Sequence, residues 1–150
     1  MANADITAND TLIKGVNSFR NYLQSEAHLI DGGEYAGILA TGTHDLFKIP
    51  AGNMLVGLSI VALGDTASSG EATVQFKAKI GSAAENIGDA IGKADLAAGD
   101  VVTLTASKIK GYNAENDIVI EMTVGVAALT GLKLFVIANY VPVKEFITAG

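Results

Sequence analysis

The chain has 150 residues, of which 49% are apolar and 17% charged, and its formal net charge at pH 7 is −6. This length suits a single domain with a core of its own, and the apolar content excludes a disordered chain. The acidic balance, with Arg20 as the only arginine, argues against nucleic-acid binding, and the lack of cysteine excludes disulfides and thiolate metal sites.

The sequence shows no signal peptide at residues 1–5 and no apolar run of membrane-spanning length. The first residues, 1–5, lack the basic start and the apolar run of a signal peptide. The longest apolar runs, 54–63 and 132–143, are far shorter than a membrane span. We therefore expect a soluble protein that has no membrane partner.

Residues 1–33 are predicted to form a separate N-terminal arm. Asp10 can cap a helix, and the pattern predicts an amphipathic helix over residues 11–26 that ends before Gly32 and Gly33. Its apolar stripe has spacings of four, three and four residues: Leu12, Val16, Phe19 and Leu23. The arm either covers one end of the following domain or docks on a neighbouring subunit. In the second case Arg20 could bind a carboxylate of the partner.

Residues 34–150 are predicted to form a β domain. Segments 71–80 and 117–126 alternate apolar and polar residues, which is typical of antiparallel strands with one face on a core. Seven or eight short strands with turn signals about every ten residues predict a mainly β fold, an antiparallel β-sandwich or jelly roll. The other predicted strands are 35–41, 44–49, 54–63, a short one near 87–91, 101–105 and 132–143.

The last predicted strand, 132–143, is apolar on both faces. One face carries Leu132, Leu134, Val136, Ala138 and Tyr140, and the other carries Phe135, Ile137 and Val141. The second face needs a cover, which either the N-terminal helix or another subunit could supply. We expect self-association, with a symmetric trimer as the favoured state.

No catalytic constellation accompanies these strands. His28 and His44 are the only histidines and are expected in exposed loops, without the partners of a Ser-His-Asp relay or a zinc site. Asp89, Asp95 and Asp100 raise a calcium hypothesis, but aspartates in turns bond to their own backbone and need no metal. The sequence therefore predicts no enzyme and no cofactor.

Three segments carry a resemblance to known proteins. Residues 49–60 hold an IPAG turn that enters an apolar strand, residues 94–100 read ADLAAGD, and residues 134–141 form an apolar strand that ends near an aromatic residue. They resemble small β-rich structural proteins of tailed bacteriophages, among them jelly-roll head decoration (cement) proteins. The likeness covers roughly residues 46–143.

The resemblance implies a virion protein that is made in the host cytoplasm and sits, often as a trimer, on the outer surface of a phage head. Such a subunit binds the major capsid protein and stabilises its contacts. The alternative is a jelly-roll binding module of a head or tail fibre that contacts host glycans, although the chain has no tryptophan. The residues themselves offer these interface candidates: Leu12, Val16, Phe19, Arg20, Leu23, Phe135, Ile137 and Val141.

Overall fold

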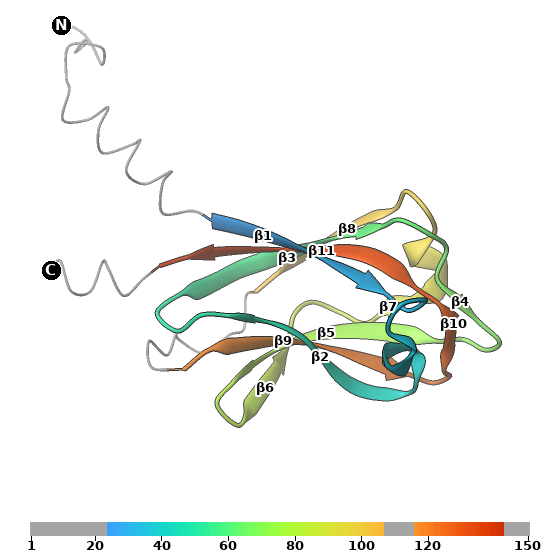
Figure 1. Cartoon of the computed structure of the whole chain (residues 1–150), viewed down its shortest axis with the longest axis horizontal. Coiled ribbons are helices and arrows are strands. Elements are labelled where there is room, and N and C mark those ends of the chain that lie inside the picture. Colours follow the sequence, from blue (N-terminus) through green and yellow to red (C-terminus); the bar gives the residue numbers. More distant parts are fainter. Residues whose placement is uncertain (1–23, 107–115, 143–150) are drawn as a thin grey trace, which may run out of the picture.

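Two antiparallel β-sheets face each other in the computed structural model, which describes residues 24–106 and 116–142 (Figure 1). The strands are β1 (Gln24–Asp31), β2 (Gly42–Ile49), β3 (Met54–Ala62), β4 (Ala67–Ser68), β5 (Thr73–Ile80), β6 (Ala83–Asn86), β7 (Ile91–Gly92), β8 (Val101–Thr105), β9 (Ile118–Gly125), β10 (Leu129–Gly131) and β11 (Lys133–Val141). Two short 3-10 helices, η2 (Ala36–Leu39) and η3 (Lys93–Leu96), lie in the connections.

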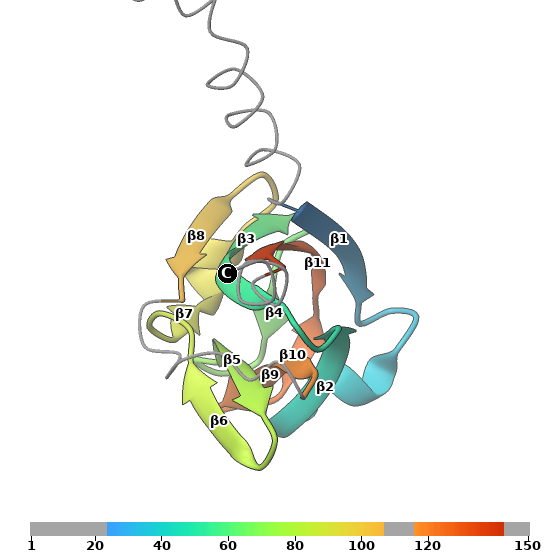
Figure 2. The ribbon, with the colours of Figure 1, turned by 90° about the vertical axis from the view of Figure 1, so that its left-hand side faces the viewer.

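The strand order is that of a jelly roll. One sheet has the order β1-β11-β3-β8 and the other β2-β9-β5-β6, with β7 also paired to β5, and the short strands β10 and β4 form a third, two-stranded sheet. Figure 2 looks along the strands and shows the two sheets as separate layers. Successive long strands cross from one layer to the other, so each sheet joins strands that are distant in the sequence. The predicted antiparallel sandwich is confirmed.

The core lies between the sheets because each long strand turns its apolar residues inward. In β5 the inward residues Val74, Phe76 and Ala78 are almost fully buried, while Gln75, Lys77 and Lys79, which alternate with them, are only half-buried. The inward residues of β11 are buried in the same way, and they meet those of β5 and β9 across the core. The period-two pattern in the sequence is therefore the direct cause of the two layers.

The predicted turn at residues 50–53 joins β2 to β3. Gly52 has a φ of +90°, a conformation that glycine adopts without the steric cost of a Cβ atom. The Nδ2 of Asn53 donates to the carbonyl oxygen of Pro50 at 2.8 Å, and the backbone N–H of Ala51 donates to Asp117 Oδ1 at 2.9 Å. This turn lies at the end of the molecule where β1 begins, because Val141 pairs with Met54 and Tyr140 with Gln24.

Two sequence predictions need correction. Residues 24–26, expected at the end of a helix, belong to strand β1, so the helix cannot extend past residue 23. Residues 35–41 were expected to form a strand and instead contain η2, because here the chain crosses from one sheet to the other. The rest of the predicted helix, residues 11–23, lies outside the described residues, and for residues 1–23 a separate arm stays a prediction.

Val126 is a strained residue and gives a first testable prediction. It follows β9 with a φ of +69°, and its side chain is 80% exposed. A left-handed conformation costs an L-residue roughly 1–2 kcal/mol, and it is least suited to a β-branched one. Replacing Val126 by Asn, which tolerates this region, should therefore raise the melting temperature by about 2–4 °C. Thermal unfolding followed by circular dichroism measures this, and Val126→Ala, which keeps the same backbone problem, should gain less. An unchanged or lower melting temperature in Val126→Asn would contradict the prediction.

Candidate functional site

Most of the exposed large apolar side chains in the described residues gather on the outer face of the four-stranded sheet. On this outer face the most exposed apolar residues are Val101 at 63% and Leu29 at 44%, while Phe135 is 39% exposed. We call this surface the apolar face and define it by Leu29, Met54, Val56, Val61, Val101, Phe135, Ile137 and Val141.

One row of the apolar face runs across all four strands. Leu29 of β1 pairs with Phe135 of β11, Phe135 pairs with Val61 of β3, and Val61 pairs with Val101 of β8. Neighbouring strands lie about 4.8 Å apart, so this row spans about 14 Å. A continuous row of apolar side chains that no other element of the described chain covers is typical of an interaction surface.

The apolar face also extends along β11 toward the end where β1 begins. Ile137 lies two residues beyond Phe135 and pairs with Ala27 and Ser59, which are small. Val141 pairs with Met54 at the far end, past a bulge in the pairing between Asn139 and Tyr140. Asn139 interrupts the apolar residues here, because it faces outward and its Oδ1 accepts a 2.6 Å hydrogen bond from Ser25 Oγ. The charged residues at outward positions of this sheet, Asp31 and Lys133, pair with each other at the opposite end. The face is therefore uncharged over most of its length.

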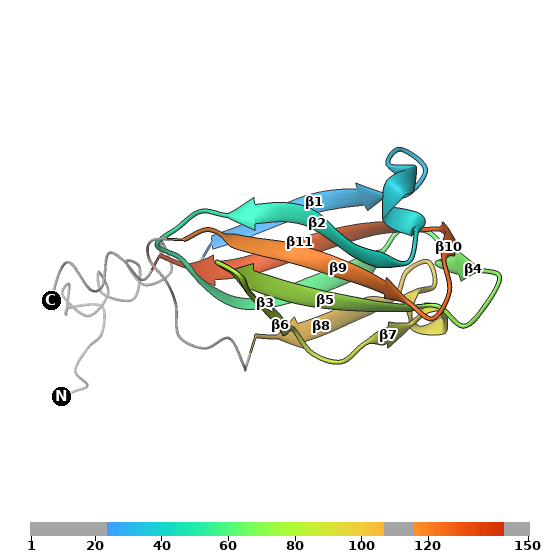
Figure 3. The same cartoon turned by 90° about the horizontal axis from the view of Figure 1, so that it is seen from below.

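The outer face of the other sheet has the opposite character. Its outward positions carry mostly charged and other polar side chains, and Figure 3 views the molecule from this side. Lys79 lies 3.6 Å from Glu121, a carboxylate whose residue is only 5% exposed. The charged residues of this face are Asp45, Lys48, Lys77, Lys79 and Glu121. The sandwich thus presents one apolar face and one charged face.

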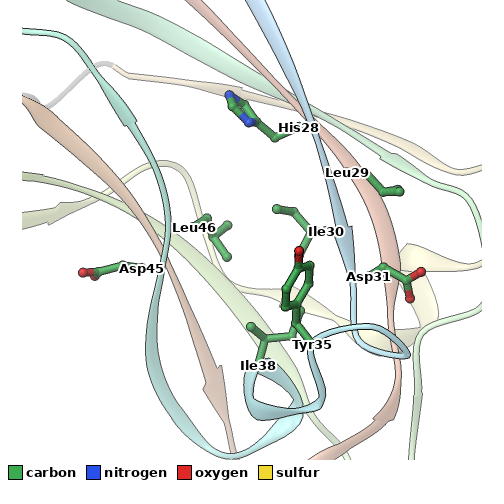
Figure 4. Close-up of a pocket in the computed structure, with 8 residues that line it drawn as sticks. All are labelled: His28, Leu29, Ile30, Asp31, Tyr35, Ile38, Asp45 and Leu46. Carbon is green, nitrogen blue, oxygen red and sulfur yellow. The ribbon is translucent and has the colours of Figure 1, made fainter.

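A small pocket of about 360 Å³ opens at the side of the sandwich between the edge strands β1 and β2. Figure 4 shows that Ile30, Ile38, Leu46 and Tyr35 gather around it, whereas the carboxylates of Asp31 and Asp45 point away. The Oδ1 of Asp31 already accepts a hydrogen bond from the backbone N–H of Gly33. The lining of the pocket is therefore partly apolar and partly polar, and its two carboxylates do not converge on a point where they would orient a ligand.

Both histidines lie in strands, which corrects the prediction of exposed loops. His28 of β1 is half-buried and stacks on Phe47 of β2, with ring centroids 3.9 Å apart and an interplanar angle of 13°. Its Nε2 lies 3.4 Å from Glu26 Oε2. His44 of β2 makes a 2.8 Å hydrogen bond between its Nε2 and the carbonyl oxygen of Ala40. The His28–Phe47 stack ties the two sheets together at their open edge.

Tyr140 fixes the start of β1 to β11. Burial raises the pKa of its phenol, and the charge of Glu26 and a hydrogen bond to Glu26 raise that pKa further. Glu26 pairs with Ala138 and Tyr140 with Gln24, so both side chains lie on the inner side of the sheet near the start of β1. The side chain of Glu26 also keeps 37% of its surface exposed, which allows β1 to carry a carboxylate on its inward face.

The described residues hold no group of three or more histidine, aspartate or glutamate side chains that could bind a metal. Asp100, one of the three aspartates that suggested calcium, accepts a hydrogen bond from the N–H of Ala97 at 3.0 Å, as expected for a turn. Within residues 24–106 and 116–142, the structure contains no helix with the length and hydropathy of a membrane span.

The predicted interface residues divide into two sets. Phe135, Ile137 and Val141 lie together on the outer face of β11, as the sequence indicated. The other five, Leu12, Val16, Phe19, Arg20 and Leu23, lie outside the described residues. Sequence reasoning missed Leu29, Val61 and Val101, which complete the apolar row. Because these residues come from three strands far apart in the chain, only the register of pairing reveals that they are neighbours.

Comparisons with known proteins identify a similar fold. No protein-family model matches the chain, and no curated protein matches it. Among solved structures, the chain is similar to a chain from the capsid of Ralstonia phage GP4, with a TM-score of 0.51 and 21% sequence identity. The match covers 79% of this chain and 84% of the other. At this identity the likeness concerns the fold.

Proposed function

We propose that this chain is a structural virion protein, a decoration (cement) subunit that binds the outer surface of a phage head and stabilises contacts between major capsid proteins. The observation that carries the proposal is the similarity in fold, over most of both chains, to a chain from a phage capsid. The uncovered apolar face supports it, because a subunit that assembles in many copies needs surfaces that become buried only on assembly.

Charge is consistent with this role. A net charge of −6 keeps separate subunits soluble through mutual repulsion before they assemble. The charges lie largely away from the apolar face, on the other sheet and in the loops, so that assembly through the apolar face would desolvate few of them. We further propose that the subunit forms a homotrimer, in which part of the apolar face is buried between copies.

Heads that lack this protein provide the direct test of the proposed function. Purified chain added to such heads of the encoding virus should co-sediment with them and raise the temperature at which the heads melt, because added interfaces stabilise the assembled state. Albumin of similar concentration serves as a control for non-specific adsorption. Heads that neither bind the chain nor gain thermal stability would contradict the proposal.

A glycan-binding fibre module is the second candidate. Tyr35, which is 61% exposed at the mouth of the side pocket, is the observation that favours it, since aromatic rings stack on sugar rings. A glycan array tests it: reproducible binding that Tyr35→Ala abolishes, together with no binding to heads, would replace the decoration role with this one.

A further inference from the structure

We propose that residues 1–23 of one copy of this chain dock on the apolar face of a second copy, so that subunits are joined by exchanged N-terminal arms. The proposal concerns contacts between copies of the chain, and it holds or fails independently of what the assembled protein binds.

The dimensions of the apolar face suit a single helix. Along β11, Phe135 and Val141 are six residues apart, which corresponds to about 20 Å of extended strand. Across the sheet, the row from Leu29 to Val101 spans about 14 Å. A helix is about 10 Å in diameter with its side chains, so one helix laid along β11 would cover the middle of this surface, over β11 and the strands beside it.

The N-terminal segment has a matching stripe. The sequence predicts that Leu12, Val16, Phe19 and Leu23 share one side of a helix, and from the first to the last this stripe would measure about 16 Å. A lone helix of this length is marginal in water and needs a surface to pack on. Its length agrees with the extent of the apolar face along β11.

Charge also suits this pairing. Residues 1–23 contain two acidic residues, Asp5 and Asp10, and two basic residues, Lys14 and Arg20, so the segment is neutral although the chain as a whole carries −6. Among the described residues, the charged side chains at outward positions of this sheet lie at one end of the apolar face, where Asp31 pairs with Lys133. A neutral arm on an uncharged surface avoids the cost of burying unpaired charges.

Connection length indicates that the arm reaches a second copy rather than its own sheet. The stripe continues to Leu23, and the next residue, Gln24, already pairs with Tyr140 as the first residue of β1. A helix that folds back on its own sheet needs a connection of about 2–6 residues to reverse direction. The predicted stripe leaves no residues for such a connection. The helix would therefore point away from the start of β1 without reversing, and it would meet a neighbouring copy. Exchange of such arms around a ring closes a symmetric oligomer.

Introduced cysteines can test the contact, because the natural chain has none. Chains with Val16→Cys and chains with Val61→Cys should form a disulfide-linked heterodimer when mixed in equal amounts and oxidised. A chain that carries both substitutions should give linked oligomers. Val119→Cys, on the outer face of the other sheet, replaces Val61→Cys in the control and should give no heterodimer with Val16→Cys.

Charged substitutions supply a second measurement on the full chain. Phe19→Asp in the arm and Phe135→Asp on the apolar face should each weaken self-association at least about thirtyfold, the effect of losing one interface hot spot. Circular dichroism verifies that each variant remains folded. A 1:1 mixture of the two should form heterodimers, because one intact arm meets one intact face. The proposal is overturned if the doubly substituted cysteine chain gives only an internal disulfide, or if removal of residues 1–23 leaves self-association unchanged.

Discussion

Deleting residues 1–31 should unfold the protein, whereas deleting residues 1–23 should leave it folded. The longer deletion removes β1, which pairs with β11 over eight residues and buries Ile30 against the core. Losing Ile30 alone would cost about 2–5 kcal/mol, and the lost strand pairing adds to that cost. Because a domain of this kind is stable by about 5–15 kcal/mol, little or no stability would remain.

The shorter deletion keeps every residue of β1, so circular dichroism and thermal unfolding should show the native strand signal and a melting temperature within a few degrees of the full chain. The longer deletion should give no cooperative transition, or should aggregate through the newly exposed edge of β11. A folded product after deletion of 1–31 would mean that β1 contributes little to stability. Unfolding after deletion of 1–23 would mean that the N-terminal segment is part of the core.

Strands β5 and β9 could be predicted from the sequence because each has one apolar face on the core and one largely polar face toward solvent. In β5 and β9, apolar and polar residues alternate at nearly every position, and the structure places both strands within the predicted ranges 71–80 and 117–126. The turn at Pro50 was equally clear, since proline and glycine restrict or permit specific φ values.

Strand β1 escaped prediction because its inward face is not apolar. Glu26 and His28 point toward the interior beside Ile30, which hides the period-two pattern. The fold explains their environment: the charge of Glu26 raises the pKa of Tyr140, and His28 stacks on Phe47. Tyr140 and Phe47 are distant in sequence from β1, so no local sequence pattern predicts their proximity to it.

The apolar face was predictable only in strand β11. Phe135 and Ile137 stood out because β11 is apolar on both faces. Val101 gave no such signal, since a valine at the start of a short strand is ordinary, and it gains meaning only as the end of a row that begins at Leu29. The pairing register between strands that are distant in the sequence is therefore the information that the structure adds.

A charged residue at position 137 should convert the proposed trimer into monomers. Ile137 is half-buried at the middle of β11, on the apolar face, between the small residues Ala27 and Ser59. An aspartate there can still reach water in a monomer, so the fold should survive. In an oligomer that covers this face, the carboxylate would be buried without a partner, which costs several kcal/mol. A loss of about 2.7 kcal/mol in the free energy of association corresponds to a hundredfold weaker affinity, so self-association should weaken by at least that factor.

Val119→Asp is the matched control for Ile137→Asp. Val119 is also a half-buried aliphatic residue that faces outward from a central strand, β9, but it lies on the charged face and pairs with Lys48 and Lys79. An aspartate between two lysines is tolerated there, so Val119→Asp should keep the association state of the natural chain. Sedimentation equilibrium over a range of concentrations measures all three proteins. If the natural chain is already monomeric at high micromolar concentration, no trimer exists in free solution. If Ile137→Asp and Val119→Asp behave alike, the apolar face is not the contact between copies, because only the site of the new charge distinguishes the two variants.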